Sequence, residues 1–293
     1  LFDSSQVAIL KGPQSLYFGK NATAGVITVK TNDPGDELEI ITRANYETEF
    51  ETTTLTGVIS TPISDTWGIR LALQTRDSDK GFIENAAPDS TYTVFDAANG
   101  FSATVLDNPA PRDDEGPLEE FESARLTLKG DLSDNTTLTI KGQYTNSENV
   151  LSSISEYVKC DTLGGEPHDA TTGVPVPKGL GAECNKDYRT AANPIPPVVA
   201  QSSEMLNYFD GQLGEEYESQ SITATLNMEF DRFTWQTVFN FHDMETNWVI
   251  DADFGPTTAI FASENNQFEA YSLESRAATT SDGALNGVLG LYY

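Results

Sequence analysis

Apolar and polar side chains alternate along much of this chain with a period of two residues, the spacing of a half-buried β-strand. Between Trp67 and Leu73, for example, every second residue is a large apolar one. The alternation recurs about nine times, which predicts an all-β chain whose strands follow one another as an antiparallel meander. The alternating segments are 38–50, 53–63, 67–76, 124–132, 137–144, 222–230, 233–242, 268–277 and 285–293.

The lengths of these segments and of their connections indicate a membrane barrel. The predicted strands have roughly 9 to 12 residues, close to the 9 to 11 of a tilted membrane-spanning strand and longer than the usual 5 to 6. All long insertions fall at one end of the strands, as the extracellular loops of a transmembrane β-barrel do. Short turns are predicted at 64–66, 133–135, 231 and 281–283, and long insertions at 77–120, 148–218 and 247–267. A soluble β-sandwich with an aromatic core is the alternative.

The two faces of the predicted strands differ in chemistry. Apolar residues are expected to face lipid, and the polar face is expected to line the lumen. Predicted lipid-facing residues are Leu38, Leu71, Leu126, Ile140, Leu226 and Trp235, and predicted lumenal residues are Arg43, Arg70, Lys129 and Arg276. Lumenal bases have three candidate partners: a plug, an anionic solute, or a neighbouring acid such as Glu274 beside Arg276.

Composition narrows the possible functions. The chain has 17 Lys and Arg against 45 Asp and Glu, a net charge of −28, which excludes a nucleic-acid binder that relies on a basic surface. Two Cys and two His cannot form a Cys/His metal cluster, so no such metal site is expected. No other cofactor is expected either. The acidic run 113–115 leaves a hard-cation site in a loop open.

Residues 7–34 carry the most specific motif of the chain, VAILKGPQSLYFGKNATAGVITVKTNDP. Pro13 lacks an N–H donor and ends the strand before it, while the glycines allow the backbone to turn around a loop tip. The run resembles the end of the plug domain of the TonB-dependent outer-membrane receptors. The residues that carry the plug motif are Gly12, Pro13, Gly19 and Gly25. A weaker resemblance is Leu273–Arg276, similar to a Glu-x-Arg strand common in these barrels.

The resemblance implies two domains within an internal piece of a longer protein. Residues 1–36 would be the C-terminal part of the plug, and residues 37–293 the first part of a barrel of about 22 strands. The plug apex would bind the solute. The apex residues are Tyr17, Phe18, Lys20 and Asn21, which offer aromatic surface and hydrogen-bond donors.

The resemblance also implies a location, partners and a function. The location is the outer membrane of a Gram-negative bacterium. The partners are the inner-membrane TonB complex, whose contact segment is absent from this sequence, together with outer-membrane lipid, lipopolysaccharide and a bulky solute. The function is active uptake of that scarce solute, by default a ferric siderophore, without enzymatic chemistry. Cobalamin and oligosaccharides remain open as solutes.

The sequence gives weaker support to functions from other classes. A secreted all-β carbohydrate-active enzyme is the main alternative, and it needs two carboxylates roughly 5 to 10 Å apart. No spacing in the sequence singles out such a pair among the 45 acids. An adhesive β-protein has no fixed-period repeat to support it.

Cys160 and Cys184 lie in the insertion 148–218, which the barrel reading places outside the cell. Because the periplasm that the chain crosses is oxidising, we expect these cysteines to form a disulfide. Closing a loop of about 25 residues stabilises the folded state by roughly 3 kcal/mol in the chain-entropy model.

Overall fold

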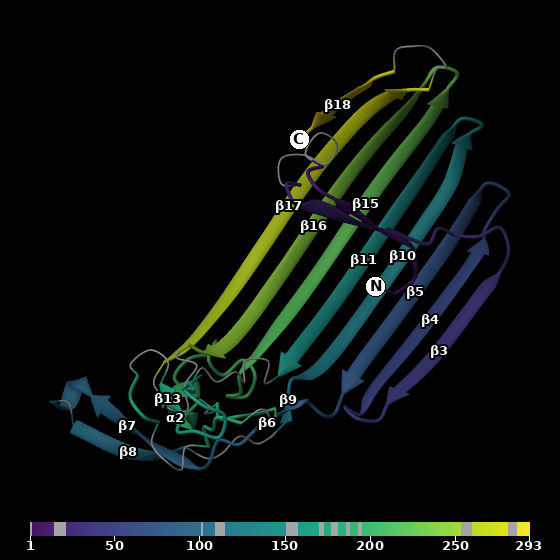
Figure 1. Cartoon of the computed structure of the whole chain (residues 1–293). Coiled ribbons are helices and arrows are strands. Elements are labelled where there is room, and N and C mark those ends of the chain that lie inside the picture. The colour runs from purple at the N-terminus through teal and green to yellow at the C-terminus, as the bar shows by residue number, and fades with distance from the viewer. Residues whose placement is uncertain are drawn as a thin grey trace.

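The nine predicted strands form one continuous sheet. The structure is a computed structural model, and it describes residues 2–14, 22–100, 102–108, 115–150, 158–169, 173–176, 181–185, 188–192, 195–252, 260–280 and 286–293. Nine antiparallel strands pair in the order β18-β17-β16-β15-β11-β10-β5-β4-β3 (Figure 1). They are β3 Glu39–Glu47, β4 Thr52–Pro62, β5 Trp67–Ser78, β10 Leu118–Ser133, β11 Thr136–Val150, β15 Gly214–Phe230, β16 Phe233–Asp251, β17 Phe261–Thr279 and β18 Val288–Tyr292.

The sheet order confirms the predicted meander, because neighbours in the sheet follow one another along the chain once the small strands of the insertions are set aside. Tight turns join β4 to β5, β10 to β11 and β15 to β16 at one end of the sheet. Long connections join β5 to β10 and β11 to β15 at the other end (Figure 1). In the turn before β5, the Ser64 hydroxyl accepts a hydrogen bond from the Trp67 N–H at 3.1 Å.

Most of the central strands are longer than the sequence pattern predicted. Strands β16 and β17 have 19 residues each, against a prediction of roughly 9 to 12. The ladder continues into segments that were expected to be loop, such as 243–251 and 261–267. In 243–251 the outward positions become mostly polar and the apolar residues Met244, Trp248 and Ile250 lie inward, while in 261–267 both faces are mostly polar. The outward apolar series that marked the strand therefore ends. Hydrogen bonding between strands continues without the hydrophobic signal that made them visible in the sequence.

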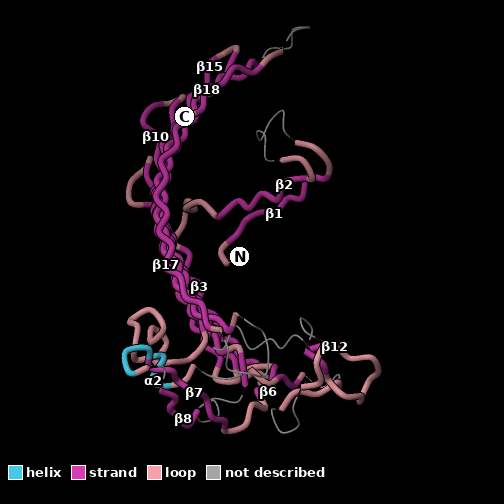
Figure 2. Tube along the Cα trace, turned by 90° about the vertical axis from the view of Figure 1, so that its left-hand side faces the viewer, coloured by secondary structure: helices cyan, strands magenta, loops and turns pink. Residues whose placement is uncertain are grey.

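Cross-strand pairing assigns every strand residue to one of two faces. In an antiparallel ladder, residues directly opposite each other point to the same side. Arg70, Lys129 and Lys141 contact a separate two-stranded hairpin, which lies on the concave side of the sheet (Figure 2). We call this side the inner face. By register, Arg43 and Arg276 also belong to it. The predicted outward residues Leu71, Leu126, Ile140, Leu226 and Trp235 all lie on the outer face.

The outer face is apolar near the short turns and acidic near the long connections. On β15 its apolar part runs from Ile222 to Phe230. Phe230 and Phe233 stack with ring centroids 4.5 Å apart beside the turn that joins β15 to β16. Tyr144 and Tyr271 mark the other boundary, as interfacial aromatic residues do in membrane barrels. Beyond them the outward side chains include Glu120, Glu122, Glu148, Glu216, Glu218, Asp243, Glu245 and Glu269.

The long connections carry small elements of their own. Leu213 and Phe209 pack with Val249 in a local hydrophobic cluster against the outer face of β16. No helix among the described residues is long and apolar enough to cross a membrane. The small elements are β6 Ile83–Asn85, β7 Ser90–Asp96, η1 Ala97–Asn99, β8 Ser102–Asn108, β9 Glu115–Gly116, β12 Val158–Lys159, β13 His168–Asp169, β14 Arg189–Thr190 and α2 Pro197–Ala200.

Adjacent residues of β15 test the assignment of the two faces. Ile222 points outward and Ser221 inward. We expect Ile222→Arg in the full-length protein to lower the free energy of unfolding in lipid bilayers by about 2–4 kcal/mol, because an arginine there meets hydrocarbon. Ser221→Arg is the matched control and should change it by less than about 1 kcal/mol. Equal costs for the two substitutions would contradict the assignment.

Candidate functional site

A β-hairpin on the concave side of the sheet carries the plug-like motif. Strands β1 (Ser4–Lys11) and β2 (Gly25–Thr31) pair antiparallel (Figure 2). Gly12 has φ +83°, and the ladder continues past it through a hydrogen bond from the Gln14 N–H to the Ala22 carbonyl at 2.8 Å. A Cβ on Gly25 would lie 2.6 Å from the Leu10 carbonyl oxygen, so glycine is required where the second strand begins.

A buried ion cluster fastens the start of the hairpin to the sheet. Arg70 of β5 contacts Asp3 and Glu39, each at 2.6 Å. The side chains of Arg70 and Asp3 are only 5% and 4% exposed, whereas that of Glu39 is half exposed. Asn32 donates a second hydrogen bond to the Asp3 carboxylate at 2.8 Å. The cluster therefore ties both strands of the hairpin to the first strands of the sheet.

A second fastening lies at the end of β2. The Asp33 carboxylate accepts hydrogen bonds from Lys129 at 3.0 Å and from Lys141 at 3.1 Å. The Lys141 ammonium also donates to the Thr31 hydroxyl at 2.8 Å. One aspartate thus bridges β10 and β11.

The chain continues from this point into the sheet itself. The Gly35 N–H donates to the hydroxyl of Ser60, which is fully buried, at 3.0 Å. Arg125 stacks over the Phe2 ring at 5.0 Å and donates to the Phe2 carbonyl at 3.3 Å. Charged and polar contacts therefore dominate the seam between hairpin and sheet.

The two aspartates are held in their charged form. Burial alone would raise the pKa of Asp3, but hydrogen bonds from Arg70 and Asn32 outweigh it and leave that pKa below its ordinary value. At Asp33, burial is likewise outweighed by hydrogen bonds from Lys129 and Lys141, and the pKa is again lowered. Both acids are therefore anionic at neutral pH, so the hairpin presents negative charge to a basic inner wall.

Between the hairpin and the short-turn end of the sheet lies a groove of about 700 Å³. Its charged lining residues are Lys30, Asp33, Lys129, Lys141, Glu229 and Arg276. Arg276 donates to Gln236 at 2.8 Å and lies 3.7 Å from Glu274. Two of the pairings that the sequence left open therefore occur together. Lys129 and Lys141 pair with the hairpin, and Arg276 pairs with Glu274 of its own strand.

The structure places only part of the predicted site. Gly12, Pro13 and Gly25 lie at the end of the hairpin. The predicted apex residues lie outside the described residues, namely Tyr17, Phe18, Gly19, Lys20 and Asn21. Within the described residues, no group of three or more His, Cys, Asp or Glu could hold a metal ion. Asp113 and Asp114 of the acidic run also lie outside the described part.

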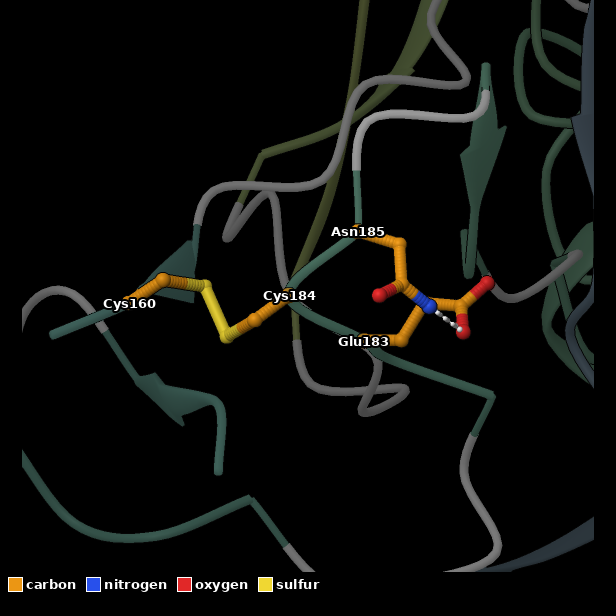
Figure 3. The surroundings of a disulfide bond; sticks show 4 residues. All are labelled: Cys160, Glu183, Cys184 and Asn185. Atoms are coloured by element: carbon orange, nitrogen blue, oxygen red, sulfur yellow. Dashed lines mark hydrogen bonds between the residues drawn. A yellow bond between two sulfur atoms is a disulfide. The ribbon is translucent and has the colours of Figure 1, made fainter. Parts of the chain in front are cut away.

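The two cysteines form a disulfide in the connection between β11 and β15 (Figure 3). Their sulfur atoms are 2.07 Å apart, and 24 positions separate them in the sequence. Beside the bond, the Asn185 side chain donates to the Glu183 carboxylate at 2.7 Å (Figure 3). The bond closes a segment that includes β13 and holds it close to the start of β14.

Comparison with solved structures identifies the fold. No protein-family model matches the chain. The ferric yersiniabactin uptake receptor FyuA from Yersinia pestis matches all of it with a TM-score of 0.66 at 14% identity. The ferric-catecholate import receptor Fiu from E. coli K12 matches 99% of it with a TM-score of 0.61 at 13% identity. The chain has the fold of a TonB-dependent receptor.

A third solved relative, the ferric enterobactin receptor PfeA from Pseudomonas aeruginosa, covers 99% of the chain with a TM-score of 0.55 at 10% identity. The chain spans only about a third of these receptors, 36% of FyuA and 35% of PfeA. In TonB-dependent receptor terms, the nine-stranded sheet matches part of the barrel and the hairpin matches part of the plug. The fold therefore agrees with the barrel that the periodicity predicted and with the partial barrel that the resemblance implied.

The sequence did not single out Asp3 and Asp33, the acids that hold the hairpin. They are two among 45 acids, and neither lies in an alternating segment. The sequence pointed instead to the basic residues that pair with these aspartates. Arg70 and Lys129 had been predicted to be lumenal bases, and a base on the inner wall needs a counter-charge.

The buried cluster predicts a strong coupling between hairpin and sheet. Arg70→Ala in the full-length receptor leaves Asp3 buried without its cation, so we expect hairpin docking to weaken by about 3 kcal/mol. Hydrogen exchange of the β1 amides would report the loss. Arg43→Ala is the control, since Arg43 lies on the inner face without an ion pair among the described residues. Additive effects of Arg70→Ala and Asp3→Ala would contradict the coupling.

The lowered pKa of Asp33 predicts a pH-dependent contribution to stability. Because the folded-state pKa lies below the ordinary value of 3.8, the contribution is complete above that value and is lost as the pH falls through the folded-state pKa. Melting curves of wild type and Asp33→Asn should therefore differ at pH 6 and converge as the pH falls through the folded-state pKa of Asp33. Asp36→Asn, at an exposed site three residues past Asp33, should match wild type throughout. A difference that grows on acidification would refute the assignment.

Proposed function

We propose that this chain is part of an outer-membrane receptor that takes up a scarce, bulky solute with energy supplied through TonB, and that a ferric siderophore is the class of solute. In this proposal residues 1–36 belong to the plug and residues 37–293 to the barrel wall. The solute enters from the side of the long connections. The receptor performs no covalent chemistry.

One observation carries the proposal: a hairpin is fastened by ion pairs to the polar concave face of a long-stranded sheet whose opposite face is apolar. An exposed apolar surface of this extent is unstable in water and stable in a bilayer. Polar, charge-paired fastening suits a plug that has to move, because its contacts can be exchanged for water without exposing apolar surface. The matching solved structures are named as uptake or import receptors for ferric chelates.

Uptake by cells tests the proposal. Cells whose sole ferric-chelate receptor is the full-length protein should accumulate radiolabelled iron, and should stop when TonB is deleted or the proton-motive force is collapsed. A short bifunctional thiol reagent bridging Asp33→Cys and Lys141→Cys should block accumulation while leaving solute binding intact. Each single cysteine variant, treated alike, is the control. Accumulation that persists without TonB would refute the mechanism.

A further inference from the structure

The inner face is not polar throughout. Its loop half on β15, β16 and β17 carries a group of aromatic, imidazole and thioether side chains, which we call the inner aromatic patch. Elsewhere the inner face consists mostly of Ser, Thr, Asn, Gln and charged residues. The patch consists of Tyr217, His242, Met244, Trp248 and Phe268. An apolar group on a wall that otherwise favours water calls for an apolar partner.

Register places the patch beyond the hairpin, toward the long connections. Lys141, which holds the hairpin, lies in one cross-strand row with Thr223 and Asn240. The next row toward the long connections contains His242, and the row after it pairs Met244 with Phe268. Trp248 lies four rows from Lys141, roughly 27 Å along the strand. The patch therefore occupies the inner wall on the side from which a solute enters.

The patch combines tilted aromatic rings with an adaptable thioether. The rings of His242 and Phe268 have centroids 6.3 Å apart at an interplanar angle of 56°. Phe268 is 50% exposed, so one side of its ring is open. Met244 lies directly across the ladder from Phe268, and its flexible thioether can adjust to an irregular partner. Rigid rings beside a flexible thioether suit a bulky ring-containing ligand.

The charges around the patch select against anions. Trp248 is paired across the ladder with Glu215 on one side and Glu264 on the other. The loop halves of these three strands, 214–222, 242–251 and 261–270, contain no Lys or Arg. Aromatic faces are negative at their centres and attract cations. An anionic solute would find carboxylates and ring faces here, and no basic side chain on these strand segments.

We propose that the inner aromatic patch binds the solute, and that this solute is a metal chelate with flat apolar or aromatic groups and a neutral or positive net charge. The inference rests on the proposed function and narrows it, because it excludes trianionic ferric catecholates as the preferred cargo. Trp248 and Phe268 provide the stacking surface, and Glu215 and Glu264 set the charge preference.

Binding to the purified full-length receptor tests both parts. The probes are a cationic ferric tris-hydroxamate, a neutral ferric tris-hydroxamate with an aromatic substituent, and a trianionic ferric tris-catecholate. We expect the first two to bind at least tenfold more tightly than the third. Trp248→Ala should weaken the preferred probe about tenfold or more, the loss typical of an aromatic anchor, and Trp248→Phe should restore most of it. Glu264→Gln should reduce the difference in affinity between the cationic and the anionic probe.

Trp235→Ala is the matched control, because Trp235 is a half-exposed tryptophan of the same strand on the outer face. It should leave all three affinities unchanged. Tighter binding of the anionic probe, or equal effects of Trp248→Ala and Trp235→Ala, would overturn the inference.

A thiol placed in the patch tests whether the patch is open in the whole receptor. Thr246→Cys lies on the inner face between Met244 and Trp248. We expect a membrane-impermeant maleimide to label it on intact cells, and the preferred probe to protect it. A thiol that is unreactive, or reactive without protection, would show that the patch packs against the receptor's own chain or lies off the solute path.

The two levels of the proposal fail differently. If energised cells accumulate none of the three probes, the proposed uptake function is wrong. If they accumulate a probe but prefer the anionic one, uptake stands and the assigned solute charge is wrong.

Discussion

Backbone hydrogen bonding in a hydrocarbon environment is the constraint on which this architecture depends. No water is available there to satisfy an N–H or C=O group, so each strand must pair with its neighbours along its whole membrane-embedded length. Strands β4, β5, β10, β11, β15 and β16 meet that demand with an antiparallel partner on each side. The ladder also fixes the side chains, because a shift by one residue would exchange the two faces. An apolar exterior and a polar interior follow from one register.

The same register explains how much could be predicted. Wherever the two faces differ in polarity, the sequence alternates and the strand is visible, as between Trp67 and Leu73. Beyond Tyr144 and Tyr271 the outer face becomes acidic and its apolar series ends, so the extensions of β16 and β17 could not be told from loop. The hairpin was found through its Gly-Pro motif. Its fastening to the sheet was not, because Asp3 and Arg70 are 67 residues apart and only the fold brings them together.

Charge in this chain is distributed by role. The excess of acids gathers in the long connections and at the outer rim, while four bases of the central strands, Arg70, Arg125, Lys129 and Lys141, contact the hairpin segment. Asp3 and Asp33 are held by Arg70, Lys129 and Lys141 at distances of 2.6 to 3.1 Å. Replacing such contacts with water costs far less than exposing an apolar seam of equal area, since ions are well solvated on release. An ion-paired contact of this kind fixes the position of the hairpin on the sheet, and a pulling force can still separate the two without exposing apolar surface to water.

The inner wall then divides into two chemical regions along the strands. Near the short turns it is basic and hydrogen-bonded to the hairpin, and near the long connections it is aromatic with carboxylates on either side of Trp248. A neutral or cationic solute stacked on the aromatic region would gain little from the basic one while the hairpin keeps those bases paired. If the proposed uptake moves the hairpin, Lys129 and Lys141 lose Asp33 and their ammonium groups become hydrated. A solute that leaves the aromatic region would then meet a hydrated, basic region that offers it no stacking surface, so the wall holds the solute at one level only.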